Sequence, residues 1–283
     1  MLAWLFAHHT GREFLVRVED IDTARARAES ETRQLEDLAA LGITWVGEPL
    51  KQQHRSAAYQ AALDSLPTYE CFCSRKDIVA AASAPHVPPG HYPGTCRNLT
   101  EAQREAKRAE FAAAGRLPAI RLAAQVSSFT ITDYYAGTVT CEVDDFILRR
   151  GAVISQGQQP DWAYNLAVVV DDGYQRVDQV VRGDDLLSSA GRQAYLAELL
   201  GLAIPEYVHV PLVLGKDGKR LSKRDGAITL RQLAGEELDS VAVARVFSQL
   251  AASIGVPHVG TMEELAARFN PQLLPREPYI FHN

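Results

Sequence analysis

The chain has 283 residues, of which 47% are hydrophobic and 23% are charged, and its formal net charge is −6. These values are typical of a globular protein with one large or two ordinary domains, and no apolar run approaches the roughly 18 residues of a membrane span. The apolar residues 1–7 lack a basic leader, so we expect no signal peptide, no membrane anchor and a cytoplasmic location. The acidity argues against a general nucleic-acid coat, but it is compatible with a local basic surface that binds one RNA.

The first part of the chain alternates between strand and helix patterns. Residues 2–9 predict a helix that lacks an N-terminal capping residue. The β-branched segment 13–20 predicts a strand that ends in carboxylates, and helices are predicted over 26–41 and about 55–66. Such alternation is typical of a parallel α/β sheet.

Residues 67–147 interrupt this pattern. Four prolines between positions 85 and 93 predict a rigid irregular loop, and Thr100 with Gln103 predicts a capping box for the helix that follows. Short strands are expected after this helix. The α/β alternation returns from Asp145, and helical sequence closes the chain. We therefore predict an α/β domain that is interrupted by an insertion and followed by a helical tail.

The insertion contains a candidate metal site. Three of the four cysteines fall within 26 residues, namely Cys71, Cys73 and Cys96. Cysteine thiolates bind zinc, and a structural zinc ion has four ligands in a tetrahedron. Three cysteines so close in sequence therefore favour a metal site over three cysteines that only pack in a core. Ligand chemistry alone favours His91 or His86 as the fourth ligand, because imidazole is the commoner partner, whereas Tyr92 would have to bind as a phenolate.

Two strand ends carry candidate ligands for a small molecule. Glu19 ends one predicted strand and Arg182 ends another, and ligands of open α/β folds bind at this edge of the sheet. An arginine and a glutamate on adjacent strand ends would hold the carboxylate and the ammonium group of an amino acid. The alternatives are a solvated strand end at Glu19 and a core aromatic at Tyr164.

A basic loop stands out in this acidic chain. Five basic residues and one acidic residue lie between Lys216 and Arg224. Asp217-Gly218 alone predicts a solvated hairpin turn. Clustered Lys and Arg side chains on a glycine-flanked loop also suit an anion such as phosphate.

Several segments together resemble one known family. They are "VRVEDID", "AYNLAVVVDD", "VVRGDDLL", "HVPLVLGKDGKRLSKRDGA" and the "CFC" and "YPGTC" pair around the Pro-rich loop. In order and over essentially the whole chain, they resemble the catalytic core of the class I glutamyl-tRNA synthetases, and in particular the short glutamyl-Q tRNA(Asp) synthetases. Val168, four residues after Tyr164, agrees with the glutamyl-Q group, whereas ordinary glutamyl-tRNA synthetases have Asn there.

The resemblance implies a fold and its division along the chain. The fold class is α/β, a Rossmann-like class I aminoacyl-tRNA synthetase core with a zinc-binding insertion. Residues 1–66 would form the first half of the catalytic domain and residues 67–147 the zinc-containing insertion. Residues 148–228 would form the second half with a KMSKS-like loop, and residues 229–283 the helical tail.

The resemblance also assigns site residues. It gives Lys223 a catalytic role at the pyrophosphate and makes Arg220, Ser222 and Lys223 the binding residues for ATP, which would enter as a substrate with Mg²⁺. It assigns L-glutamate to Glu19, Tyr164 and Arg182. It assigns one structural Zn²⁺ to Cys71, Cys73, Tyr92 and Cys96, and we follow it in preferring Tyr92 to the histidines.

The implied function is ATP-dependent activation of L-glutamate and transfer of the glutamyl group to queuosine in the anticodon stem-loop of tRNA(Asp), by a monomer without membrane partners. One alternative is a fragment of a glutamyl-tRNA synthetase that charges tRNA(Glu). The 59 residues after Arg224 are too few for the anticodon-binding region of such an enzyme. The other alternative is a non-catalytic, zinc-stapled RNA-binding remnant.

One departure from the family concerns its first signature, a Pro-Thr-Gly turn and a His-x-Gly-His helix start. His8 and His9 do not replace it, because they precede the predicted strand 13–20 instead of following a strand. We expect the chain to be truncated before this motif and to be a poor or inactive ligase as given, since one half of the phosphate-binding groups would be missing.

Overall fold

The structure is a computed structural model that describes the chain except residues 22–27, 75, 79–90, 155–159, 220–228 and 282–283. The helices are α1 (Leu2–His9), α2 (Ala28–Ala40), α3 (Ser56–Asp64), α5 (Glu101–Ala113), α6 (Tyr164–Gln175), α7 (Leu187–Leu199), α8 (Leu230–Ala234), α9 (Ser240–Ser253) and α10 (Met262–Arg268). The principal strands are β3 (Thr68–Cys71), β5 (Ala119–Leu122), β6 (Ser128–Asp133), β7 (Gly137–Glu142), β8 (Ile147–Arg149), β10 (Gln179–Gly183) and β11 (Glu206–Val210). Two-residue strands are β1 (Arg17–Val18), β2 (Leu50–Lys51), β4 (Arg116–Leu117), β9 (Ala152–Val153), β12 (Val213–Leu214) and β13 (Tyr279–Ile280).

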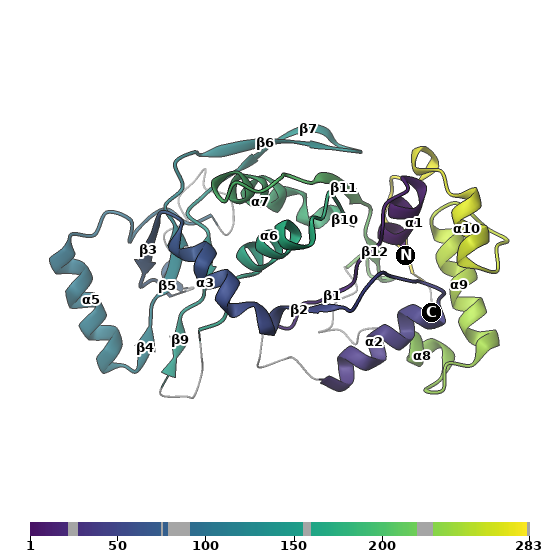
Figure 1. Cartoon of the computed structure of the whole chain (residues 1–283), viewed down its shortest axis with the longest axis horizontal. Helices are drawn as coiled ribbons and strands as arrows, with labels where there is room; N and C mark the ends of the chain where they lie inside the picture. Colours follow the sequence, from purple (N-terminus) through teal and green to yellow (C-terminus); the bar gives the residue numbers. More distant parts are fainter. Residues whose placement is uncertain (22–27, 75, 79–90, 155–159, 220–228, 282–283) are drawn as a thin grey trace.

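The molecule is elongated, with three regions along its length (Figure 1). The cysteine-bearing strand β3 and helix α5 lie at one end. Helices α6 and α7 lie in the middle beside β10 and β11, and α8 to α10 lie at the other end near both chain termini. None of the helices that the structure describes is long and apolar enough to cross a membrane.

Helix boundaries follow local sequence signals. The Thr100 hydroxyl accepts a hydrogen bond from the Gln103 amide, and the Gln103 side chain accepts one from the Thr100 amide. This reciprocal pair satisfies two donors that the first turn of α5 leaves open, and it confirms the predicted capping box. The C-terminal segment contains α8, α9 and α10 and ends in the short strand β13, and α8 begins with the same arrangement of Thr229 and Gln232.

The main sheet has the strand order β10-β11-β6-β7. Strands β10 and β11 are parallel over five residue pairs, whereas β11 meets β6 at the single parallel pair Tyr207 and Asp133. The hairpin of β6 and β7 belongs to the segment 67–147 that the sequence suggests is an insertion. This sheet therefore crosses the boundary expected at residue 147.

The strand expected over residues 13–20 is shorter than predicted. It forms ladder pairs only at Arg17 and Val18, with β2, and within the described part of the chain β1 and β10 belong to different sheets. The expected parallel sheet is thus present in separate pieces. A cavity lined by residues of both strands, among them Arg17 and Arg182, lies between them, and no described backbone there completes a ladder.

Two apolar cores hold the central region. One lies between α3, α6, α7 and the strands β5 and β8, and it includes the fully buried Leu122, Leu148 and Leu166. The other joins α1 and β11 to the tail helices α9 and α10. The tail is therefore part of the folded core and fixes α1 against the main sheet.

Helix α7 approaches the β6–β7 hairpin closely at Gly191. A Cβ atom at this position would lie 2.5 Å from the Cβ of Cys141 and 3.2 Å from the Phe129 carbonyl oxygen. We expect Gly191→Ala to destabilise the fold by about 1–3 kcal/mol, because the helix has to move away from the hairpin. Urea unfolding of this variant and of Ser188→Ala, an exposed control position on the same helix, measures the effect. Equal midpoints for the two variants would contradict this close packing.

Candidate functional site

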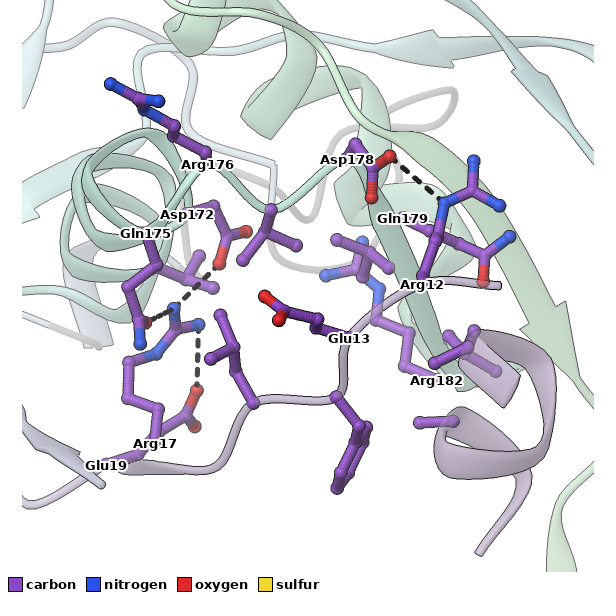
Figure 2. A pocket seen from close by; sticks show the side chains of 18 of the residues that line it. Arg12, Glu13, Arg17, Glu19, Asp172, Gln175, Arg176, Asp178, Gln179 and Arg182 are labelled. Atoms are coloured by element: carbon purple, nitrogen blue, oxygen red, sulfur yellow. Dashed lines mark hydrogen bonds and ion pairs between the residues drawn. The ribbon is translucent and has the colours of Figure 1, made fainter. Parts of the chain in front are cut away.

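A cavity of about 540 Å³ lies between α1, the segment around β1, α6 and β10 (Figure 2). Its lining includes the three residues that the family resemblance assigns to glutamate: Glu19, Tyr164 and Arg182. The sequence suggests that Glu19 and Arg182 sit on adjacent strand ends. In the structure they face the same cavity from strands that are not paired with each other.

Arg182 is held firmly on one side of this cavity. Its Nε donates to Nε2 of His209 at 3.1 Å, its Nη1 donates to the Gln193 amide oxygen at 2.6 Å, and its Nη2 lies 3.4 Å from the Leu186 carbonyl oxygen. The guanidinium also lies over the Tyr207 ring. No carboxylate in the described part of the chain forms an ion pair with Arg182 at salt-bridge distance. The cation is therefore positioned without being neutralised.

The opposite side of the cavity carries two acidic groups that share one arginine. Arg17 lies 2.8 Å from Asp172 and 3.7 Å from Glu19. Burial raises the pKa of Glu19 and of Asp172 above their usual values, and the attraction of Arg17 opposes this rise. Figure 2 shows Glu13 reaching into the cavity between Arg17 and Arg182. The cavity thus offers the carboxylates of Glu19 and Asp172, paired with Arg17, on one side and the Arg182 cation on the other.

Tyr164 begins α6 and lines the cavity between these charges. Burial raises the pKa of its hydroxyl and the nearby Glu19 acts in the same direction, whereas Arg182 lowers it. The group is therefore a neutral phenol that can donate or accept a hydrogen bond. Together, these side chains can bind a small zwitterion with its carboxylate at Arg182 and its ammonium group near Glu19. The residues expected to bind ATP, Arg220, Ser222 and Lys223, lie outside the described residues.

The second candidate site is the cysteine cluster. The sulfur atoms of Cys71, Cys73 and Cys96 all lie within 4.8 Å of one another. The Tyr92 hydroxyl oxygen is 3.3 Å from Sγ of Cys71 and 3.7 Å from Sγ of Cys73, and the latter is 3.5 Å from Sγ of Cys96. The four groups that the resemblance assigns to zinc therefore converge on one point.

The spacing of these atoms fits a tetrahedral zinc site. Zinc–sulfur bonds of about 2.3 Å separate tetrahedral sulfur ligands by about 3.8 Å. A hydrogen bond with Cys96 lowers the pKa of the Cys71 thiol, whereas the same contact and burial raise the pKa of Cys96, so the cluster favours one thiolate, at Cys71. The residues present therefore fit the ion.

The surroundings of Tyr92 favour it over His91 as the fourth ligand. The backbone amide of Cys96 donates to the Tyr92 oxygen at 2.9 Å, and the Arg121 guanidinium lies 3.6 Å from the centre of the Tyr92 ring. Burial and the thiols of Cys71 and Cys96 raise the pKa of Tyr92, whereas the Cys96 amide lowers it, and the position of the hydroxyl beside the thiols is what favours this residue. His91 instead has Nδ1 3.9 Å from a Glu142 carboxylate oxygen. His86, the other histidine considered, lies outside the described residues.

Two buried carboxylates tie the cysteine cluster to the rest of the molecule. Asp144 accepts from the Tyr92 amide at 2.9 Å and from Nε of Arg192, on α7, at 2.8 Å. Asp145 accepts from the Tyr69 hydroxyl and from Nη1 of Arg97. Sequence reasoning missed both residues. The available signal was a pair of acidic residues directly after a predicted strand.

The residues that hold Arg182 were missed as well. His209 lies within an apolar strand pattern, Gln193 lies within a helix, and Asp133 ends a strand in the segment expected to be an insertion. No spacing motif connects them, because they come from three separate elements. Only the register of the folded strands brings them together.

Comparisons with known proteins place this geometry in context. The model of the class I tRNA synthetase (E and Q) catalytic domain matches residues 1–282. A glutamyl-Q tRNA(Asp) synthetase of Nocardia farcinica is 51% identical over 99% of this chain and 86% of its own length, and one of Cutibacterium acnes is 45% identical over 98% and 76%. The crystal structure of a glutamate-tRNA synthetase from Elizabethkingia anophelis superposes with a TM-score of 0.75 at 22% identity. That match covers 99% of this chain and 63% of the other.

The cysteine cluster leads to a prediction about metal content. We expect one zinc ion per chain in protein purified without chelator, as measured by elemental analysis. Tyr92→Phe removes the expected fourth ligand. The loss of a group that only hydrogen-bonds to a metal ligand typically lowers metal affinity by roughly 10- to 100-fold, so the zinc affinity of this variant should fall by at least that much. His91→Ala is the matched control and should bind zinc normally. Normal affinity in Tyr92→Phe together with loss in His91→Ala would reverse the assignment.

Proposed function

The chain belongs to the class I tRNA synthetases for glutamate and glutamine, and we propose that it activates L-glutamate with ATP and transfers the glutamyl group to queuosine in the anticodon of tRNA(Asp). It is a ligase of this class, and its reaction uses ATP. The observation that most supports this proposal is the 51% identity, over 99% of the chain, to a glutamyl-Q tRNA(Asp) synthetase. The match covers 86% of the length of that relative. The cavity that gathers Glu19, Tyr164 and Arg182 supports glutamate as the small substrate.

The charges in the cavity suit both ends of this substrate. A planar guanidinium matches a carboxylate in two hydrogen bonds, and Arg182 has donors left after its contacts to His209, Gln193 and Leu186. Glu19 would accept hydrogen bonds from the substrate ammonium group. The Tyr164 hydroxyl lies beside these charges and would fix the orientation of the bound zwitterion.

The reaction depends more on the positioning of the substrates and on the stabilisation of developing charge than on covalent catalysis by the protein. In the first step, a carboxylate oxygen of glutamate attacks the α-phosphate of ATP, which forms glutamyl-adenylate and releases pyrophosphate. Lys223 would stabilise the charge that develops on the pyrophosphate, with Ser222, Arg220 and Mg²⁺ as further ATP contacts. In the second step, a hydroxyl of the queuosine cyclopentenediol attacks the acyl carbon and AMP leaves.

Zinc would have a structural role in this reaction. The ligands Cys71, Cys73, Tyr92 and Cys96 belong to a small apolar cluster with Tyr69, Phe72 and Phe111, beside the main cores. A closed four-ligand site adds the folding energy that such a small cluster lacks. Removal of the metal should therefore loosen residues 70–97 without unfolding the central helices.

Aminoacylation assays test the acceptor. We expect glutamyl transfer to tRNA(Asp) that carries queuosine by the version with the family's first signature, little or none by the chain as given, and no transfer by either to a tRNA(Asp) transcript without queuosine or to tRNA(Glu). The assay uses the chain itself and a version that carries the family's first signature ahead of residue 1. Charging of tRNA(Glu) alone would indicate a glutamyl-tRNA synthetase fragment. Absence of glutamate-dependent pyrophosphate exchange in both versions would indicate a non-catalytic protein.

Arg182 provides the test of the amino-acid site. Arg182→Ala should cost on the order of 2–5 kcal/mol of glutamate binding, because a buried charge pair loses one partner. Arg182→Lys should not restore the affinity, since an ammonium group cannot form the two-pronged contact. Titration calorimetry with glutamate measures both. Arg176→Ala is the matched control, because this arginine lines the same cavity but Figure 2 shows it pointing away from Arg182. Equal losses in the control would contradict a specific role.

A further inference from the structure

The hydrogen bond between Arg182 and His209 fixes the proton on the histidine ring. An arginine Nε always carries a hydrogen and can only donate. Nε2 of His209, 3.1 Å away, must therefore be the unprotonated nitrogen. The neutral ring then carries its hydrogen on Nδ1, which donates to Oδ2 of Asp133 at 2.7 Å. The chain Arg182–His209–Asp133 is thus consistent with one tautomer of the ring only.

Burial makes this tautomer persistent. The side chains of His209 and Asp133 are 1% and 0% exposed, so water cannot replace either hydrogen bond. Burial lowers the pKa of His209 and the charge of Arg182 acts in the same direction, whereas Asp133 opposes them. A second proton on the ring would lie on Nε2, directly against the Arg182 donor. The ring is therefore neutral and accepts from Arg182.

Asp133 is itself held in place by the backbone. Its Oδ1 accepts from the amides of Tyr135 and Ala136 at 2.9 and 2.8 Å, and its Oδ2 also accepts from the His209 amide at 3.0 Å. These contacts anchor it between the β6–β7 turn and strand β11. An acceptor fixed in this way orients the His209 ring, as carboxylates do for histidines at many reactive sites.

The hold on Arg182 matters because the same cavity contains carboxylates. Asp172 and Glu19 both line it, and the charge of Arg182 already affects the pKa of Asp172. A guanidinium released from His209 could turn toward these groups and pair with them. It would then compete with the carboxylate of a ligand. Fixation at Nε, together with the contacts of Nη1 to Gln193 and Nη2 to Leu186, leaves two of the five N–H donors of Arg182 for the ligand.

We propose that His209 and Asp133 are positioning residues for Arg182: Asp133 selects the histidine tautomer that accepts from Arg182, and this contact keeps the guanidinium directed at the substrate carboxylate. The inference rests on the proposed function, because it takes Arg182 as the glutamate-binding arginine. Neither residue is among those that line the cavity. Strand β6, which ends at Asp133, thereby contributes to substrate affinity from outside the cavity.

The tautomer can be measured in the wild-type chain without substrate. Nitrogen-15 NMR of the histidine rings should show one ring, absent in a His209 variant, with the hydrogen on Nδ1 and a bare Nε2. The Arg182 Nε–H resonance should exchange slowly with water. A His209 ring that is doubly protonated, or that carries its hydrogen on Nε2, would overturn the inference whatever the protein binds.

Two substitutions separate positioning from packing. His209→Leu fills a similar volume but offers no acceptor, so glutamate affinity should fall by roughly 10- to 100-fold, the value of one hydrogen bond to a charged group. His209→Gln supplies a carbonyl oxygen near the position of Nε2 and should restore most of the affinity. ATP binding should be the same in all three proteins, and near-ultraviolet circular dichroism checks that each variant is folded.

The outcomes distinguish this inference from the proposed function. Equal glutamate affinity in wild type and folded His209→Leu would overturn the positioning role and leave the glutamate site standing. A loss of the same size in His209→Gln would indicate packing instead of hydrogen bonding and would also overturn it. A wild-type chain with the expected tautomer and an ordered Arg182 that binds no glutamate would contradict the proposed function and, with it, this inference. If neither variant folds, the inference is judged by the tautomer of His209 in the wild-type chain: a hydrogen on Nδ1 with a bare Nε2 supports it, and any other protonation overturns it.

Discussion

The parallel register of β10 and β11 is the constraint on which the candidate site depends. It pairs Arg182 directly with His209, while the contact of β11 with β6 places Asp133 on the far side of the histidine. A shift of one residue would turn Arg182 to the other face of the sheet. The apolar neighbours Val208 and Val210 belong to the core that joins α1 and the tail helices, so burial of the core also sets this register.

The cysteine cluster depends on a second set of buried polar contacts. Asp144 and Asp145 sit between β7 and β8 and accept hydrogen bonds from the cluster on one side and from α7 and neighbouring strands on the other. Buried carboxylates are costly unless they are fully paired, and here cationic partners Arg192 and Arg97 meet that requirement. The two regions of the molecule are thus joined by specific charges as well as by apolar packing.

Much of the local structure followed from the sequence. The capping box at Thr100 and the clustering of the cysteines rest on interactions within a few residues or on ligand chemistry. The prediction of a long strand over 13–20 was wrong because it, too, rested on local sequence alone. Strand propensity reports a pleated, half-buried environment, but a ladder needs a partner backbone, and only the tertiary arrangement shows that β1 has one over two residues.

The sequence by itself determined which residue types were available for chemistry: three thiols near a tyrosine, an arginine and a glutamate at strand ends, and a basic loop around Lys223. The tertiary structure decided how they are used. It placed Glu19, Tyr164 and Arg182 on one cavity, turned Tyr92 toward the thiols while His91 lies near Glu142, and supplied Asp133 and His209 from distant elements. The physical reason is that strand register and helix packing decide which buried groups meet and how they are oriented. Both are set by the whole core and not by neighbours in the chain.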